Sequence, residues 1–378
     1  MQESMKFESL VKPAVLTQPT YEPGKPIEYV ARELGIEAAG IVKLASNENP
    51  RGASPKALAA IAAAAAELTR YPDGNGFALK AALSTRLGVD AAQIVLGNGS
   101  NDILELAAQA FLRPGDEAIY SQHAFAVYPL ATRARGAIGV EVPARDYGHD
   151  LPRMRAAITP RTRMIFVANP NNPTGTLVAA AELLEFIASV RPDVLVVLDE
   201  AYNEYLEPAD RCDSVGWLAR FPNLLVSRTF SKAYGLAALR IGYGIMDAGI
   251  ADMLNRVRQP FNVNALAQAA ALAALADAGY VDASRALNRA GLAQLAAGFA
   301  ALGVEFLPSH GNFVLAKVGN AEQVYQRLLA QGVIVRPVAN YGLPEWLRIS
   351  VGLPDENARF LDILGSLLGS VPLSAPGR

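Results

Sequence analysis

Short apolar runs alternate with longer stretches of helical character along the middle of the chain. Six of these runs have the length of buried strands, at residues 94–97, 117–120, 164–168, 194–198, 224–227 and 241–245. Helical patterns lie between several of them, at residues 102–111, 127–135 and 179–190. Strands this apolar, alternating with helices, are typical of a mostly parallel sheet that is covered on both faces. The pattern therefore predicts an α/β fold.

The pattern changes after about residue 250. Residues 265–303 are rich in alanine and strongly helical, and strand-like pieces return at 313–315, 333–335 and 347–350. At the other end of the chain, prolines and a glycine interrupt any regular pattern within residues 1–35. We therefore expect three parts, namely an N-terminal arm (1–35), a large domain (36–260) and a smaller α/β domain (261–378).

Composition narrows the class of protein. Of the 378 residues, 51% are hydrophobic and 19% are charged, as in a soluble protein with an ample core. The formal net charge of −2 gives no reason to expect nucleic acid or an anionic membrane as a partner. Cys212 is the only cysteine, so no internal disulfide can form and the reducing cytoplasm is the expected compartment. No apolar run has the length of a membrane span, the N-terminus lacks the pattern of a signal peptide, and three scattered histidines do not favour a metal site.

Lys232 is the candidate nucleophile. It follows Thr229 and Ser231 and precedes Arg240, so hydroxyl and guanidinium groups that can bind a phosphate lie close to it in the sequence. A lysine amine with a lowered pKa can link covalently to a carbonyl cofactor. Asp199 ends an apolar strand, where an ionised carboxylate is costly unless it is paired. The pyridinium N–H of pyridoxal phosphate would pair with Asp199, although capping of a following helix would also explain this carboxylate.

Three further side chains could contact such a cofactor. Asn172 and Tyr202 can hydrogen-bond its phenolic oxygen. The segment Asn172-Pro173-Thr174-Gly175 could also be only a turn, because its residue types dominate turns. Phe125 could stack on the pyridine ring, or it could belong to the core.

A glycine-rich loop and two arginines complete the candidates. Gly99, Ser100 and Asn101 open a helix, where backbone N–H groups bind anions; ordinary helix capping is the alternative. Arg348 is a lone charge within an apolar, strand-like stretch, and Arg336 follows a similar stretch. A guanidinium there suits bidentate recognition of a carboxylate or phosphate, whereas an edge-strand arginine with its head group in water is the simpler explanation.

Together these segments resemble the fold-type I pyridoxal-phosphate aminotransferases, and among them the histidinol-phosphate aminotransferase family. The resemblance covers nearly the whole chain, and its most family-specific segments are residues 19–26 (PTYEPGKP), 44–50 (LASNENP), 70–73 (RYPD) and 97–101 (GNGSN). It implies a large domain with a mostly parallel seven-stranded sheet between helices, plus a smaller α/β domain.

The resemblance also implies a role for each candidate residue. Lys232 would carry pyridoxal 5′-phosphate covalently and act as general base and acid, with Asp199 at the ring nitrogen and Tyr202 at the phenolic oxygen. The other residues implied in binding the cofactor are Gly99, Ser100, Asn101, Phe125, Asn172, Thr229, Ser231 and Arg240, together with Tyr71 from a neighbouring subunit. Those implied in binding the substrate are Tyr21, Asn49, Arg336 and Arg348. Phe125 stands where many relatives carry tyrosine, which keeps the stacking but removes a phenol.

The activity implied is amino transfer between histidinol phosphate and 2-oxoglutarate, which yields imidazole acetol phosphate and glutamate in histidine biosynthesis. A homodimer with shared active sites is implied as well. Two alternatives stay open, namely an aromatic amino-acid or broad-range aminotransferase and a lyase of the threonine-phosphate decarboxylase type. A cofactor-sensing transcription factor is disfavoured, because the arm is short, broken by prolines and not basic.

Overall fold

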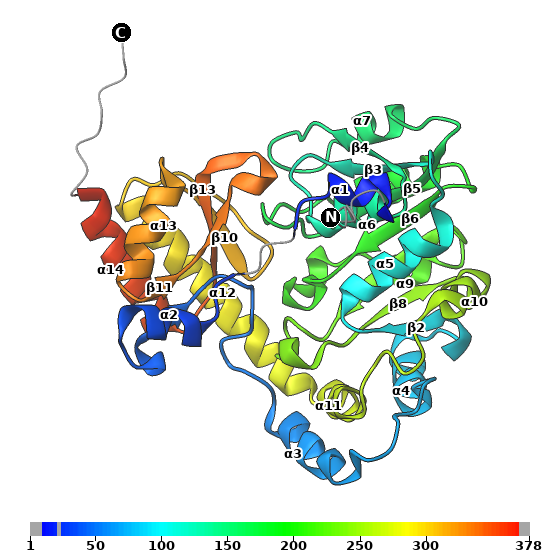
Figure 1. The fold of residues 1–378 in the computed structure, drawn as a ribbon, viewed down its shortest axis with the longest axis horizontal. Coiled ribbons are helices and arrows are strands. Elements are labelled where there is room, and N and C mark those ends of the chain that lie inside the picture. Colours follow the sequence, from blue (N-terminus) through cyan, green and yellow to red (C-terminus); the bar gives the residue numbers. More distant parts are fainter. Residues whose placement is uncertain (1–9, 21–23, 370–378) are drawn as a thin grey trace, which may run out of the picture.

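A seven-stranded sheet forms the centre of the computed structural model, which describes residues 10–20 and 24–369 (Figure 1). The strand order is β2-β8-β7-β6-β5-β3-β4, and all neighbours are parallel except those of β8. The strands are β2 (Ile94–Gly97), β3 (Glu117–Ser121), β4 (Ile138–Val142), β5 (Thr162–Ala168), β6 (Leu195–Asp199), β7 (Leu224–Thr229) and β8 (Gly242–Met246). The prediction of a mostly parallel sheet is thus confirmed, with the six expected strands found to within two residues at either end.

Strand β4 was not predicted from the sequence, and its position in the sheet explains why. It lies at the edge of the sheet beside β3, and most of its residues are exposed or half-buried. An edge strand needs no continuous apolar run, so the pattern that revealed the central strands is missing here.

Helices cover both faces of this sheet, as the apolar strands require. One face packs against α5 (Ser100–Phe111), α6 (Val127–Ala134) and α10 (Ala248–Val257). The other face packs against helices on the opposite side of the sheet. These are α3 (Pro55–Ala64), α4 (Phe77–Leu87), α7 (Leu151–Ala156), α8 (Ala180–Ser189), α9 (Ser214–Trp217) and α11 (Ala265–Leu275).

A smaller α/β part lies beside the large sheet, on the left of Figure 1. Its antiparallel sheet has the order β12-β13-β10-β9. The strands are β9 (Phe306–Leu307), β10 (Phe313–Lys317), β12 (Arg336–Val338) and β13 (Leu343–Ser350), and the helices are α12 (Ala278–Ala301), α13 (Ala321–Ala330) and α14 (Pro354–Gly369). A separate hydrophobic cluster holds this part together.

The apolar contacts divide the chain differently from the boundaries expected at residues 35 and 260. Helix α2 (Ile27–Leu34) and strand β1 (Val42–Lys43) belong to the cluster of the smaller part, and β1 pairs in parallel with β11 (Val333–Ile334). Helix α11, expected in the smaller domain, packs instead on α3 and α4. Each of these segments is amphipathic or alanine-rich, so its own pattern does not specify the core against which it packs.

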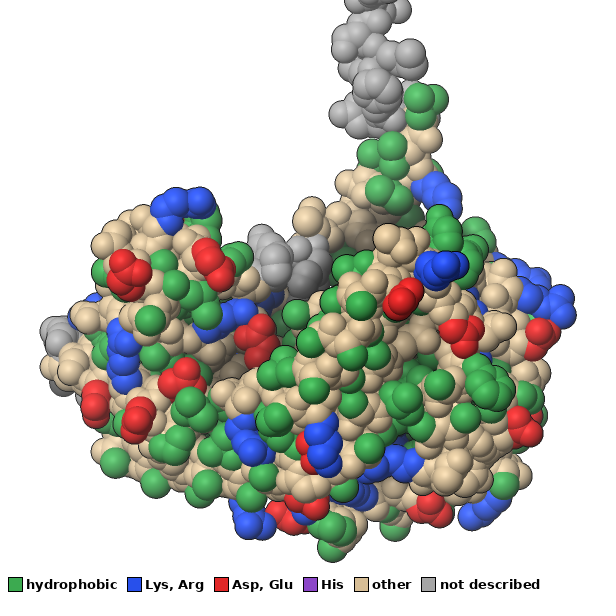
Figure 2. Space-filling model, turned by 90° about the horizontal axis from the view of Figure 1, so that it is seen from below, with side chains coloured by type: hydrophobic (Ala, Val, Ile, Leu, Met, Phe, Trp, Pro, Cys, Tyr) green, Lys and Arg blue, Asp and Glu red, His purple; other side chains and the backbone are tan. Residues whose placement is uncertain are grey.

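The N-terminal helix α1 (Pro13–Leu16) lies against α6 of the large part. On the face seen in Figure 2, basic and acidic side chains are interspersed rather than gathered by sign. Within residues 10–20 and 24–369, no helix combines the length and the apolar character needed to cross a bilayer.

Candidate active site

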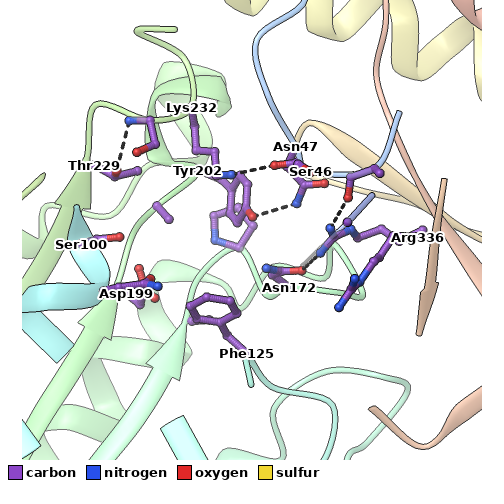
Figure 3. A pocket seen from close by; sticks show the side chains of 18 of the residues that line it. Ser46, Asn47, Ser100, Phe125, Asn172, Asp199, Tyr202, Thr229, Lys232 and Arg336 are labelled. Atoms are coloured by element: carbon purple, nitrogen blue, oxygen red, sulfur yellow. Dashed lines mark hydrogen bonds between the residues drawn. The ribbon is translucent and has the colours of Figure 1, made fainter. Parts of the chain in front are cut away.

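A cavity of about 220 Å³ lies between the carboxyl ends of the central strands and the smaller sheet (Figure 3). Parallel strands place their ligand-binding loops at this edge of a sheet. The side chains from the strand ends, Ser100, Asp199, Thr229, Ser231 and Lys232, form what we call the strand-end wall. Arg336 and Arg348, from the smaller sheet, form the arginine wall. Ala45, Ser46 and Asn47, which we call the bridging segment, also line the cavity.

The N-terminus of α5 forms one end of the strand-end wall. Helix α5 begins at Ser100, directly after Gly99. The backbone φ of Gly99 is 80°, a value that residues other than glycine rarely adopt. A Cβ on Gly99 would also collide with the guanidinium of Arg240. The Arg240 Nη1 donates to Ser231 Oγ (3.3 Å), and the Ser231 N–H donates to Thr229 Oγ1 (3.1 Å). Helix N–H groups, two hydroxyls and a guanidinium therefore converge in a cradle suited to a phosphate.

Asp199 lies at the end of β6 with both carboxylate oxygens buried. Its Oδ2 accepts a hydrogen bond from the Tyr128 hydroxyl (2.9 Å), and its Oδ1 has no partner among the described residues. Burial raises the pKa of Asp199 to about 6, and the hydrogen bond from Tyr128 opposes that rise. A buried acceptor without a donor is costly, so this oxygen is well placed to receive an N–H from a ligand.

Lys232 extends into the cavity beside Tyr202. Its Nζ donates to the carbonyl oxygen of Ser46 (3.1 Å) and lies 5.9 Å from the centre of the Tyr202 ring. Burial, followed by the positive charge of Arg348, lowers the pKa of Lys232 to about 7. A large fraction of this amine is therefore uncharged and nucleophilic near neutral pH.

The bridging segment makes hydrogen bonds with polar side chains on both sides of the cavity. Asn47 Nδ2 donates to the Tyr202 hydroxyl (2.9 Å), and Arg348 Nη2 donates to the carbonyl oxygen of Ala45 (2.7 Å). Because the Tyr202 oxygen already accepts this bond, its own proton can be donated elsewhere. Burial raises the pKa of Tyr202 to about 12, so this proton is retained at neutral pH.

The arginine wall comes from neighbouring antiparallel strands. Arg336 on β12 and Arg348 on β13 are partners in the strand register, so both belong to one face of the sheet. Arg348 is buried, and its Nη1 donates to Asn172 Oδ1 (2.6 Å). Arg336 is half-buried. Two guanidinium groups in one cavity have the chemistry to bind a doubly charged or bidentate anion.

The structure brings most of the expected residues to this cavity. Ser100, Asn101, Phe125, Asn172, Asp199, Tyr202, Thr229, Ser231, Lys232, Arg240, Arg336 and Arg348 all line it. Gly99 is in the loop behind Arg240. Tyr21 lies outside the described residues.

Two expected residues lie elsewhere. The Asn49 amide donates to the Ala233 carbonyl oxygen and to Ser284 Oγ (both 2.9 Å), and Asn49 does not line the cavity. It thus differs from the expectation of a substrate contact, because backbone and hydroxyl groups of the same chain use its amide. Tyr71 is 83% exposed and stacks on Phe261 (4.8 Å between ring centres), away from the cavity of its own chain.

Sequence analysis missed three contributors. Ser46 and Asn47 belong to the segment 44–50 that carried the family resemblance, so a signal was present, but Asn49 was chosen from it instead. Tyr128 lies in the run Val127-Tyr128-Pro129-Leu130, which is indistinguishable from core sequence.

These groups fit pyridoxal phosphate, the cofactor that the resemblance implies. The phosphate cradle suits the phosphate of this cofactor, and the unpartnered Asp199 Oδ1 suits its ring N–H. The partly buried Lys232 amine suits its aldehyde. Phe125, two residues before α6, presents its ring to the same space (Figure 3). Among the described residues, no group of histidine, cysteine or carboxylate side chains is arranged to hold a metal ion.

Known proteins share this architecture and sequence. The family model for aminotransferases of class I and II matches residues 39–364. The chain is 64% identical over 352 residues to histidinol-phosphate aminotransferase 1 of Thiobacillus denitrificans, covering 93% of this chain and 92% of that protein. This chain belongs to the histidinol-phosphate aminotransferase family. The resemblance seen in the sequence is thereby confirmed.

Other members of the histidinol-phosphate aminotransferase family agree. Histidinol-phosphate aminotransferase 2 of Pseudomonas fluorescens is 61% identical, over 96% of this chain and 98% of that protein. The crystal structure of the Sinorhizobium meliloti histidinol-phosphate aminotransferase in complex with pyridoxal-5′-phosphate matches with a TM-score of 0.89 and 29% identity, covering 96% of this chain and 99% of that one. The predicted fold class is therefore confirmed, and the protein is an aminotransferase.

Proposed function

We propose that this enzyme transfers an amino group between histidinol phosphate and 2-oxoglutarate, with pyridoxal 5′-phosphate as its cofactor. The products are imidazole acetol phosphate and glutamate. The observation that carries the proposal is the identity of 64% and 61%, over more than nine-tenths of each chain, to two proteins named histidinol-phosphate aminotransferase. The cofactor in the Sinorhizobium meliloti structure and the fit of the cavity support the choice of cofactor.

When bound, pyridoxal phosphate supplies an aldehyde that accepts the amino group and a ring that withdraws electrons. Ser100, Thr229, Ser231 and Arg240 would hold its phosphate, and Asp199 would accept the ring N–H. Lys232 can take up and return a proton at neutral pH, because the pKa of its amine is lowered to about 7. Tyr202 already accepts a hydrogen bond from Asn47, so its own proton would be available for the phenolic oxygen of the cofactor.

The arginine wall binds the anion of either substrate. Glutamate presents an α-carboxylate, whereas histidinol phosphate has no carboxylate and presents a phosphate. Both anions accept paired hydrogen bonds from a guanidinium, so Arg348 and Arg336 can serve each substrate in turn.

Separate half-reactions test the proposed substrates. The purified, cofactor-loaded enzyme is mixed with histidinol phosphate, phenylalanine, tyrosine or threonine phosphate, and the loss of the yellow absorbance of the cofactor is followed. Fast loss at low histidinol phosphate, with slow response to the others, is the expected result. Faster loss with the aromatic amino acids would make this an aromatic aminotransferase, and release of carbon dioxide from threonine phosphate would make it a lyase.

We also propose a cytoplasmic homodimer in which Tyr71 reaches the phosphate site of the partner. Tyr71 is exposed and lies outside its own cavity, and the exposed Leu68 and Phe77 are near it in the sequence. Exposed apolar groups this close together are typical of a protein interface. The single cysteine supports the cytoplasm as the compartment.

Mixed dimers test the shared site. Subunits with Lys232→Ala are combined with subunits carrying Tyr71→Phe. If Tyr71 acts across the interface, the mixed dimer has one site with both residues intact and regains activity. If Tyr71 acts within its own chain, neither site is intact and no activity returns.

A further inference from the structure

Tyr128 is a buried polar side chain in contact with Asp199 of the strand-end wall. It lies in the first turn of α6, is fully buried, and its hydroxyl donates to Asp199 Oδ2 at 2.9 Å. A phenol has a single proton to donate, and here that proton is directed at the carboxylate. Burial raises the pKa of Tyr128 well above its ordinary value, so the proton is present at neutral pH.

Two aromatic rings prevent the Tyr128 hydroxyl from turning away. The ring of Tyr128 stacks on Phe166 with centres 4.7 Å apart and planes 7° apart. Phe125, which lines the cavity, meets Tyr128 edge-on at 5.9 Å. Phe166 is itself fully buried in β5. A side chain packed in this way has one accessible rotamer, so the direction of its O–H is set by the core.

The hydrogen bond gives the two oxygens of Asp199 different functions. Oδ2 is occupied by Tyr128, and Oδ1 has no donor among the described residues. A hydrogen bond at one oxygen restrains the rotation of the carboxylate, which favours one direction for the other oxygen. The donor also favours the ionised form of the carboxylate over the protonated form.

We propose that Tyr128 is a positioning residue, which holds Asp199 ionised and turned so that Oδ1 receives the N–H of the cofactor ring. This inference rests on the proposed cofactor. The alternative is a purely structural tyrosine, since Tyr128 belongs to the same hydrophobic cluster as Phe166 and Tyr120.

Binding of two cofactors separates positioning from packing. The apoenzyme with Tyr128→Phe is titrated with pyridoxal phosphate and with 1-deazapyridoxal phosphate, in which carbon replaces the ring nitrogen. We expect the affinity for pyridoxal phosphate to fall about tenfold, because the ionic hydrogen bond to Asp199 is weakened. The affinity for the deaza compound should stay within about twofold, because its ring offers no N–H to Asp199.

Tyr120→Phe is the matched control. Tyr120 is a buried tyrosine of the same cluster, 3% exposed, on the neighbouring strand β3, and it does not line the cavity. We expect this variant to bind both compounds as the unaltered enzyme does. An equal loss for both compounds in Tyr128→Phe, or no loss for either, would overturn the positioning role.

A second variant covers the case in which Tyr128→Phe does not fold. Incorporation of 3-fluorotyrosine at position 128 keeps the ring and makes the hydroxyl a stronger donor. The preference for pyridoxal phosphate over the deaza compound should then be retained or increased, and a reduced preference would contradict the proposal. If the unaltered apoenzyme binds neither compound, the proposed cofactor fails, and that result is distinct from a failure of Tyr128.

Discussion

The strand-end wall and the arginine wall face the same cavity but are built in different ways. Asp199, Thr229 and Lys232 are at or just beyond the ends of neighbouring parallel strands, so their closeness follows from the sheet alone. Arg336 and Arg348 belong to a different sheet, and the bridging segment connects them to the first wall. The strand-end wall is formed by one sheet. The position of the arginine wall relative to it depends on how the smaller part packs against the large sheet.

This difference has a consequence for specificity. A wall built on strand ends varies little in geometry, which suits a cofactor that must always bind in one orientation. Arg348 of the arginine wall is hydrogen-bonded to Asn172 and Ala45. We therefore expect a change in the smaller part to act first on the substrate site and to reach the cofactor site through Asn172.

The largest expected effect comes from the strand-end wall. Lys232→Ala removes the group that moves the proton, so turnover should fall by about 10,000-fold. Steady-state rates with histidinol phosphate and 2-oxoglutarate measure this loss. Lys56→Ala, which alters an exposed lysine of α3, should leave the rate unchanged. If turnover by Lys232→Ala falls only a few-fold, the strand-end wall contributes no more to the rate than the arginine wall does.

Removal of one arginine at a time compares the two members of the arginine wall. Arg348→Ala should slow both half-reactions about a hundredfold, because the buried guanidinium also orients Asn172. Arg336→Ala should cost about tenfold, since this half-buried side chain supplies only part of the anion site. Single-turnover absorbance measurements with each amino donor give both values. An unchanged glutamate half-reaction in Arg348→Ala would refute the shared anion site.

The bridging segment offers a sharper comparison between two asparagines. Asn47→Gly tolerates the φ of 53° but loses the bond to Tyr202, so kcat should fall about tenfold. Asn49→Ala should leave KM unchanged and lower the free energy of unfolding by about 1–3 kcal/mol, because two buried hydrogen bonds are lost. Steady-state kinetics and urea unfolding distinguish the two. A raised KM in Asn49→Ala would restore the substrate role first expected for it.

The smallest effect is a shift in pH dependence. Only the uncharged amine of Lys232 reacts with the cofactor aldehyde, so the rate at which apoenzyme captures pyridoxal phosphate should rise with pH through a midpoint near 7, the lowered pKa of this lysine. The charge of Arg348 contributes to that lowering, so Arg348→Gln should move the midpoint to higher pH.

Stopped-flow absorbance over a range of pH measures this midpoint. Arg336→Gln serves as the comparison and should move it less, because Arg336 is not among the main causes of the lowered pKa. Equal shifts in the two variants would show that Arg348 has no special influence on Lys232.

Patterns in the local sequence were sufficient to predict the central strands and the main candidate residues at their ends. The central strands could be predicted because fully buried strands need continuous apolar residues, and Asp199 was conspicuous as a charge at the end of one of them. Lys232 was identified because hydroxyl and guanidinium groups surround it in the sequence. Tyr128 had no such signal, since its polar contact is with a residue 71 positions away.

By itself, the sequence determined the family, the α/β class and the chemical types that gather at the strand ends, because residue spacing and strand periodicity are local properties of a chain. The tertiary structure alone decided that Asn47 rather than Asn49 faces the cavity, that Tyr128 donates to Asp199, and that α2 and β1 join the smaller part. Those outcomes depend on which surfaces meet when the two parts pack. Contacts between distant segments are set by shape and hydrogen-bond satisfaction over the whole molecule, which no local pattern contains.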